Sequence, residues 1–119
     1  MSTILPYQDP QQPIEPRVQD LLGRMTLEEK IAQIGSVWVY ELLNDQRLNP
    51  DKVNARLVQG IGQITRLAGA SSLDPVGCAQ LGNDLQRYLV EETRLGIPAL
   101  IHEECCSGYT ARNATAFPQ

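Results

Sequence analysis

The chain has 119 residues, of which 42% are hydrophobic and 20% charged, and its formal net charge is −4. This length suits one domain of ordinary size, and the composition is that of a globular protein rather than a disordered one. Lys and Arg are scattered along the sequence, so we expect neither nucleic acid nor an anionic membrane surface among the partners.

Two features of the sequence bear on location and redox state. Residues 1–16 contain no basic stretch followed by a continuous apolar run, which is the pattern of a secretory signal, and no apolar run approaches the ~20 residues of a membrane span. We therefore expect a cytoplasmic protein. The three cysteines are an odd number, which does not indicate a disulfide framework.

Four prolines lie within residues 1–16, at positions 6, 10, 13 and 16. Prolines so close together predict an extended N-terminal arm rather than a helix. A helical pattern begins at Arg17, and its apolar face is formed by Val18, Leu21, Leu22 and Met25. The predicted organisation is therefore an arm, residues 1–16, and a folded region, residues 17–119.

A second short helix is predicted to start after Thr26, because Thr26 and Glu29 have the spacing of a capping box. Its apolar residues should point inward, namely Leu27, Ile31 and Ile34. The run 37–40 has the composition of a strand. It contains Trp38, the only tryptophan, for which a place in the core is favoured over stacking on a ligand.

Two proline signals mark the remaining helices. Asn49 and Asp74 each precede a proline, as a helix N-cap precedes a proline in the first helical position. The predicted elements are helices over residues 50–60 and 75–94, alternating with strands over residues 61–67 and 97–101. A strand, a long helix and a second strand make a βαβ unit with parallel strands, so the fold class is α/β.

The βαβ unit does not close on itself, because the last strand runs into a loop. A parallel sheet either has helices on both faces or closes into a barrel, and a (β/α)8 barrel takes ~250 residues. We therefore interpret the fold as an incomplete part of a larger one.

Polar residues gather directly after the last predicted strand, at the carboxyl end where α/β folds bind ligands. They are His102, Glu103, Glu104, Cys105, Cys106 and Ser107. Adjacent cysteines fit the usual spacing of a zinc site poorly, and nothing in the sequence orders a cysteine–histidine nucleophile pair. The favoured interpretation is that both cysteines are small buried residues that pack the loop.

The carboxylates of this segment cannot form the acid/base pair of a glycosidase. Such a pair lies ~5 to 9 Å apart and faces a sugar from two sides, whereas Glu103 and Glu104 are adjacent and point to opposite faces of an extended strand. One of them can point into a site while the other points away. Glu28 and Glu29 lie on a predicted helix, where a solvated or capping role is the stronger interpretation.

Four stretches resemble, in the same order, the N-terminal segment of family 3 glycoside hydrolases. They are RVQDLLGRMTLEEKIAQI, GIGQI, QLGNDLQRYLVEETR and GIPALIHEECCSGYTARNATAFPQ, at residues 17–34, 60–64, 80–94 and 96–119. The resemblance covers nearly all of the chain after the arm. It implies that the α/β fold is the beginning of a (β/α)8 barrel, incomplete in this chain.

The resemblance also implies a site. Glu104 matches the acidic residue that accepts hydrogen bonds from hydroxyls of the sugar next to the bond that is cleaved. Arg66 and Tyr109 are further candidates for lining that pocket. Residues 105–108 read Cys-Cys-Ser-Gly where many members have Ala-x-His-Gly, so the choice between glucoside and xyloside stays open.

The expected function is that of the N-terminal part of a retaining exo-β-glycosidase acting on β-glucosides or β-xylosides. The family's nucleophile and acid/base come later in its sequence, so we expect no catalytic residue here, and no cofactor or metal. Expected partners are a small carbohydrate in the intact enzyme and the remainder of the barrel or a second copy. The alternative is a truncated, non-catalytic binding or interaction protein.

Overall fold

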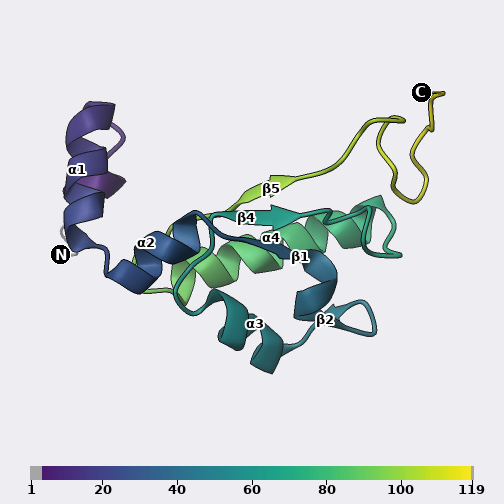
Figure 1. Cartoon of the computed structure of the whole chain (residues 1–119), viewed down its shortest axis with the longest axis horizontal. Coiled ribbons are helices and arrows are strands. Elements are labelled where there is room, and N and C mark those ends of the chain that lie inside the picture. Colours follow the sequence, from purple (N-terminus) through teal and green to yellow (C-terminus); the bar gives the residue numbers. More distant parts are fainter. Residues whose placement is uncertain (1–3, 119) are drawn as a thin grey trace.

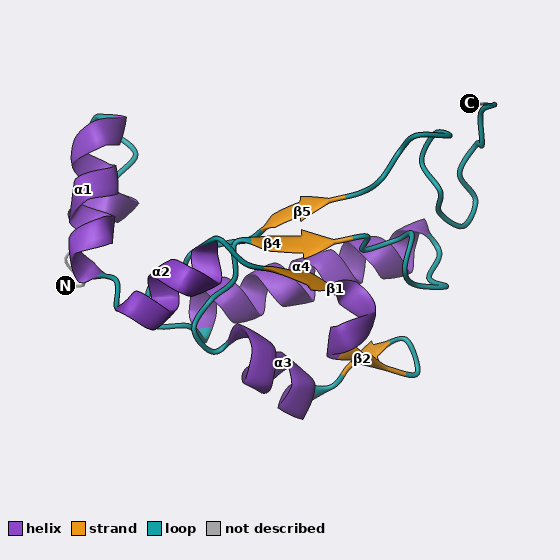
Figure 2. Cartoon of the chain, in the orientation of Figure 1, coloured by secondary structure: helices purple, strands orange, loops and turns teal. Residues whose placement is uncertain are grey.

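The computed structural model describes residues 4–118 and is a mixed α/β structure (Figures 1 and 2). Its helices are η1 (Pro6–Gln8), α1 (Ile14–Arg24), α2 (Leu27–Gln33), η2 (Val39–Leu42), α3 (Pro50–Leu57) and α4 (Pro75–Glu91), where η marks a 3-10 helix. Its strands are β1 (Ser36–Trp38), β2 (Leu43–Asn44), β3 (Arg47–Leu48), β4 (Gln63–Thr65) and β5 (Leu100–His102). The α/β prediction and its parallel strands are confirmed.

The sheet that organises the molecule is parallel, with strand order β1-β4-β5. Val37, Ile64 and Ile101 are in register, and α3 and α4 pack against the face on which they lie (Figure 2). Leu57, Ile64, Leu85 and Leu89 have no exposed surface at all. Burial of such side chains is the main stabilising term of the fold, at ~1.5–3 kcal/mol for each residue.

Helix α4 also fixes the approach to β5 by hydrogen bonds. The Gln86 side-chain amide donates to the Ala99 carbonyl at 2.7 Å and accepts from the Ala99 N–H at 3.0 Å. This amide pairs with both polar groups of the Ala99 backbone, so the chain enters the sheet at a defined register.

Among residues 4–118, no element packs over the other face of the sheet. Trp38, Thr65 and His102 share it, because they are paired across the strands, and so does Leu100, two residues before His102. Trp38 is 41% exposed and Leu100 64% exposed. The expectation that Trp38 belongs to the core is therefore wrong, because the tryptophan points away from the face that α3 and α4 cover.

The N-terminal region is less extended than the prolines suggest. Helix α1 begins at Ile14 rather than Arg17, with Pro16 inside its first turn. Backbone N–H groups of a first turn have no intrahelical partner, so a proline there breaks no hydrogen bond. The 3-10 turn η1 folds back on α1. The Tyr7 carbonyl accepts from Arg17 Nε at 3.0 Å, and the Tyr7 N–H donates to the Asp20 carboxylate at 3.2 Å.

Helix α2 has the predicted capping box, but its orientation is opposite to the expected one. Thr26 and Glu29 exchange the two capping hydrogen bonds. The apolar side chains that should point inward are exposed, Leu27 by 68%, Ile31 by 58% and Ile34 by 85%. The physical reason is that α2 packs through Glu29, a buried carboxylate that binds Arg94 after α4. Val18 and Leu22 of α1 are also exposed and line one groove with Ile34, and we call these five exposed residues the apolar face of α1 and α2.

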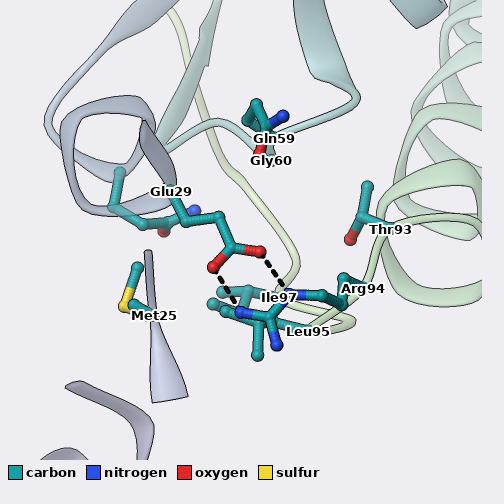
Figure 3. A pocket seen from close by; sticks show the side chains of 9 residues that line it. Met25, Glu29, Gln59, Gly60, Thr93, Arg94, Leu95 and Ile97 are labelled. Atoms are coloured by element: carbon teal, nitrogen blue, oxygen red, sulfur yellow. Dashed lines mark hydrogen bonds and ion pairs between the residues drawn. The ribbon is translucent and has the colours of Figure 1, made fainter. Parts of the chain in front are cut away.

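The Glu29–Arg94 contact ties α2 to the segment that leads into β5. Arg94 Nε and Nη2 donate to the two oxygens of Glu29 at 2.9 and 2.5 Å, and Figure 3 shows the two side chains meeting in a small cavity. The same Nη2 reaches the Arg24 carbonyl at 2.8 Å. This cavity lies where the chain enters the strands, at the amino end of the sheet, and its contacts are those of a structural clamp.

The motif Gly-Ile-Gly at 60–62 has a steric explanation. A Cβ on Gly62 would lie 1.9 Å from the Gln33 carbonyl oxygen, and Gly60 has a left-handed φ of +79°. Only glycine lets the backbone before β4 pass this close to the end of α2. The motif therefore marks a close approach between two backbones.

A few boundaries differ from the predicted ones. Helix α3 matches its cap signal, and α4 starts as predicted but ends at Glu91 rather than near Arg94. The strand predicted over 37–40 is shorter, and its second half is η2. The β2–β3 hairpin was not predicted, because its turn residues Asp45 and Gln46 adopt positive φ without the glycine that usually signals such a turn.

The molecule is elongated. Its radius of gyration is 16.2 Å, against ~13.5 Å for a compact domain of this length. Figure 1 shows the cause: α1 projects at one end and the loop after β5 at the other. Among residues 4–118, no helix combines the length and the apolar character that crossing a bilayer requires.

Candidate functional site

The candidate site lies at the carboxyl edge of the parallel sheet. Trp38, Thr65 and His102 end the three strands in one row. The chain then continues into Arg66 after β4 and into Glu103 and Glu104 after β5. The polar residues predicted after the last strand therefore lie at the same edge as Arg66, which follows β4.

The two adjacent glutamates have different environments. Glu103 accepts hydrogen bonds from the backbone N–H groups of Ala68, at 2.6 Å, and Gly69, at 3.4 and 3.3 Å. Its carboxylate therefore holds the loop between β4 and α4. The Glu104 side chain is 52% exposed, and one of its oxygens accepts from the Cys106 N–H at 2.9 Å. Of the two, Glu104 keeps hydrogen-bonding capacity for a ligand.

Arg66 connects the ends of all three strands. It has a left-handed φ of 57°, unusual for a residue with a side chain, and its N–H donates to the His102 carbonyl at 2.8 Å. Its Nη1 lies 3.8 Å from Glu104 Oε2, and its Cζ lies over the Trp38 ring, 5.8 Å from the ring centroid. A backbone held in this region at a ligand-binding edge is typical of functional positions.

Gly69 leaves room for the two side chains that order this edge. A Cβ at Gly69 would lie 2.9 Å from Arg66 Nη2 and 3.0 Å from Glu103 Oε2. The glycine therefore permits the Arg66 guanidinium and the Glu103 carboxylate to lie against the same loop.

Two polar atoms at this edge have no protein partner. Within residues 4–118, the buried side-chain nitrogens without a hydrogen bond are Arg66 Nε and His102 Nε2. A buried polar group left unpaired costs ~1–3 kcal/mol, so such groups are uncommon in folded proteins. Arg66 Nε belongs to the guanidinium that lies 3.8 Å from the Glu104 carboxylate, and His102 precedes Glu104 by two residues.

The electrostatics at Glu104 favour its charged form. Its pKa lies below the ordinary value, first because Cys106 hydrogen-bonds the carboxylate through its side chain and backbone, and then because the Arg66 cation is near. The same contact raises the pKa of the Cys106 thiol. Glu104 is therefore a carboxylate acceptor at neutral pH, which suits hydrogen bonds from hydroxyl groups.

The cysteines of this loop are not where the sequence predicted. Cys105 and Cys106 are both exposed, and only Cys78, on α4, is buried. The predicted packing of the loop by two buried thiols is therefore wrong. The loop leaves the sheet and projects at the end of the molecule opposite α1 (Figure 1). In the described part of the chain, no three His, Cys, Asp or Glu side chains gather as a metal site requires.

Tyr109 and Arg66 have different surroundings. Tyr109 lies with Leu67, Cys78 and Arg112 in a shallow groove of about 290 Å³ over the start of α4, which Arg66 and Glu104 do not line. Burial, followed by the charge of Glu103, raises the pKa of the Tyr109 hydroxyl. The neighbouring Thr110 accepts from Arg66 Nη2 at 3.2 Å, a contact that no sequence signal indicated.

A family model describes most of this chain. The model of the glycosyl hydrolase family 3 N-terminal domain matches residues 26–119. The chain belongs to glycoside hydrolase family 3. The match contains the helix with the capping box, the Gly-Ile-Gly approach to β4, helix α4, and the loop with Glu104.

A curated relative of this family 3 chain agrees with the assignment. A protein of Formosa agariphila, provisionally named a beta-xylosidase, is 38% identical over 115 residues. The alignment covers 93% of this chain and 15% of the relative. The chain thus spans about one seventh of the length of the relative it matches.

Proposed function

We propose that these residues form the opening part of a (β/α)8 barrel in a retaining exo-β-glycosidase, which hydrolyses O-glycosidic bonds of β-xylosides or β-glucosides. Glu104 binds hydroxyl groups of the sugar next to the bond that is cleaved. The nucleophile and the acid/base come from outside these residues. The observation that carries the proposal is the exposed Glu104 carboxylate at the carboxyl edge, beside Arg66 and separate from the structural Glu103.

The uncovered face of the sheet supports the barrel. Helices α3 and α4 pack on one face only, and the other carries the row Trp38, Thr65 and His102. In a (β/α)8 barrel the helices form an outer ring, the strands close on their inner face, and ligands bind at the carboxyl edge. The position of Glu104, just past the carboxyl end of β5, suits substrate binding in such an arrangement.

The chemistry of glycoside transfer explains why a carboxylate is useful there. The transition state has oxocarbenium character and a flattened ring, and hydrogen bonds to sugar hydroxyls strengthen as it forms. An ionised acceptor makes these bonds about twice as strong as a neutral one would. The relative's name favours a xyloside, and the two sugars share the hydroxyl pattern that such an acceptor contacts.

The test uses the whole gene product that carries these residues. Hydrolysis of nitrophenyl β-xyloside and nitrophenyl β-glucoside is measured for the wild type, for Glu104→Gln, and for Glu91→Gln, an exposed glutamate on α4. Loss of a charged hydrogen bond is worth ~1.5–3 kcal/mol, so kcat/KM should fall about 10- to 100-fold in Glu104→Gln and stay within about twofold in the control. An unchanged kcat/KM in Glu104→Gln would contradict the role of Glu104.

The apolar face of α1 and α2 favours a second possibility, a non-catalytic interaction protein. Five apolar side chains of this face are at least 42% exposed, namely Val18, Leu22, Leu27, Ile31 and Ile34. Either the remainder of a barrel or a second copy of the chain could cover them. Sedimentation of the 119-residue chain separates the two: a stable dimer that binds no apolar dye favours the interaction protein, and a dye-binding monomer favours the barrel.

A further inference from the structure

Two cysteines that the proposed function does not use lie side by side in the loop after β5. Cys105 and Cys106 are adjacent in sequence, and both are exposed. The third cysteine, Cys78, is buried on α4. A thiol that an oxidant converts to a sulfenic acid condenses with a second thiol beside it to form a disulfide. The exposed pair therefore has the arrangement of a site for reversible oxidation, and Cys78 does not.

The peptide group between the two cysteines is bonded to Glu104. Its N–H, which belongs to Cys106, donates to Glu104 Oε1 at 2.9 Å. Its carbonyl, which belongs to Cys105, accepts from the Gly108 N–H at 3.1 Å. The Cys106 thiol hydrogen-bonds the same carboxylate, and this contact raises the pKa of the thiol. The Cys106 side chain and backbone thus both bind the acidic residue of the candidate site.

A disulfide between these cysteines would change both contacts with Glu104. Adjacent Cα atoms are ~3.8 Å apart across a peptide bond, whereas a relaxed disulfide joins Cα atoms ~4.4–6.8 Å apart. Closing the small ring therefore requires the peptide between the cysteines to rotate, which moves the Cys106 N–H, and it removes the thiol hydrogen outright. Such a strained disulfide is readily reduced, so the change is reversible.

We propose that Cys105 and Cys106 form a redox modification site at which a hydroperoxide makes a disulfide, and that this disulfide releases Glu104 and weakens sugar binding. The effect on sugar binding rests on the proposed function, whereas the disulfide itself does not. A dithiol reductant restores the two thiols and the contacts of Glu104.

The reaction has two steps. The Cys105 thiolate attacks one oxygen of the peroxide, the O–O bond breaks, and the other oxygen leaves as hydroxide, which takes up the proton that Cys105 lost and becomes water. The Cys106 sulfur then attacks the Cys105 sulfenic acid, the S–O bond breaks, and the hydroxyl group leaves with the Cys106 proton as a second water. Two electrons pass from the two sulfurs to the peroxide.

The test treats the whole gene product with hydrogen peroxide, blocks free thiols with iodoacetamide and digests the protein with trypsin. Residues 95–112 then form one peptide, which contains Cys105 and Cys106, and Cys78 lies in another. The oxidised peptide should carry no blocking group and be lighter by two hydrogens than the reduced, unblocked peptide. Over the same time course, kcat/KM for a nitrophenyl β-xyloside or β-glucoside should fall about tenfold, the scale of a lost hydrogen bond to a charged group. Dithiothreitol should reverse both changes.

Two variants make the test specific. Cys105→Ser has no partner for Cys106, so peroxide should leave its kcat/KM within about twofold of its own untreated value. Cys78→Ser keeps the pair and should respond to peroxide as the wild type does.

Several results would overturn the inference. They are a peptide 95–112 that stays blocked at both cysteines, one that carries added oxygen in place of a disulfide, and one that is linked to a second molecule. A disulfide that forms without a change in kcat/KM would refute the link to Glu104. The proposed function is tested without oxidant, by untreated Glu104→Gln, so its failure is distinguishable from a failure of this inference.

Discussion

Arg66 Nη1 lies 3.8 Å from Oε2 of Glu104, and this contact joins the end of β4 to the end of β5. The two residues are 38 positions apart in sequence, and each also has a second contact, Arg66 with the Trp38 ring and Glu104 with the Cys106 N–H. The carboxyl edge is therefore a connected group of side chains, in which a change at one residue should be felt at the others.

Replacing Arg66 tests this connection. Arg66→Lys keeps the charge but loses the planar guanidinium that lies over Trp38 and reaches Thr110. In the whole gene product we expect KM for a β-xyloside or β-glucoside to rise about tenfold, the scale of one lost hydrogen bond to a charged group. Arg112→Lys is the matched control and should leave KM unchanged, because Arg112 is exposed and donates to the Ser72 carbonyl at 3.4 Å, away from Glu104. Equal effects in both variants would contradict the account.

Gly69→Ala should disturb the site more than the fold. Its new methyl group would lie 2.9 Å from Arg66 Nη2 and 3.0 Å from Glu103 Oε2, both at the ends of flexible side chains that can move. We expect a loss of stability within ~1 kcal/mol together with a clear rise in KM. Calorimetry and steady-state kinetics on the same variant check this, and Gly23→Ala, where a Cβ meets nothing within 4 Å, supplies the comparison.

Gly62→Ala should lower the stability of the fold more than it disturbs the site. A Cβ there would lie 1.9 Å from the Gln33 carbonyl oxygen and 2.7 Å from its carbon, so two backbone segments must separate. Overpacking of this kind costs ~1–3 kcal/mol or more. Urea denaturation of the chain should show a midpoint well below that of Gly23→Ala, and equal midpoints would mean that α2 and β4 are not held together as described.

The clamp between Glu29 and Arg94 predicts a pH dependence of stability. The pKa of Glu29 lies below its ordinary value of 4.5, first because Arg94 hydrogen-bonds the carboxylate. A depressed folded-state pKa stabilises the protein above the unfolded-state value and loses that contribution as pH falls through the folded-state value. The melting temperature of the wild type should therefore drop below about pH 4.5 more steeply than that of Arg94→Ala.

The Arg94→Ala variant also has a predicted effect at neutral pH. It leaves the buried Glu29 carboxylate with one capping hydrogen bond, from the Thr26 N–H, so we expect a clear fall in melting temperature. Arg87→Ala, which breaks an exposed pair with Asp84, should cost less than ~0.5 kcal/mol. If the melting temperatures of the wild type and Arg94→Ala changed with pH in parallel, the Glu29–Arg94 contact would not stabilise the fold as described.

Local signals predicted much of the fold. The caps at Thr26, Asn49 and Asp74 start helices where expected, because a cap depends on residues next to one another in sequence. The orientation of α2 was missed, since it depends on Arg94, 65 positions from Glu29. The prediction that Trp38 lies in the core failed for a similar reason. A large aromatic residue is usually buried, but the position of α4 decides which face of β1 is covered.

The candidate site was predicted in part. The polar run after β5 stands out in the sequence because it follows an apolar strand, and the family resemblance selected Glu104 from it. The division of roles between Glu103 and Glu104 follows from the Ala68 and Gly69 N–H groups, and no pattern near residue 103 reveals these partners. The sugar-binding roles of Glu104, Arg66 and Tyr109 stay predictions, as do the partners and the location in the cytoplasm.

The central claim, that Glu104 binds a sugar hydroxyl, is tested most directly by crossing Glu104→Gln with monodeoxy substrates. In the whole gene product, kcat/KM is measured for a β-xyloside or β-glucoside and for each analogue lacking one hydroxyl. If Glu104 binds a particular hydroxyl, removing that group should cost the wild type about 10- to 100-fold and cost Glu104→Gln much less. If removing each hydroxyl lowered kcat/KM by the same factor in the wild type and in Glu104→Gln, the claim that Glu104 binds a sugar hydroxyl would be contradicted.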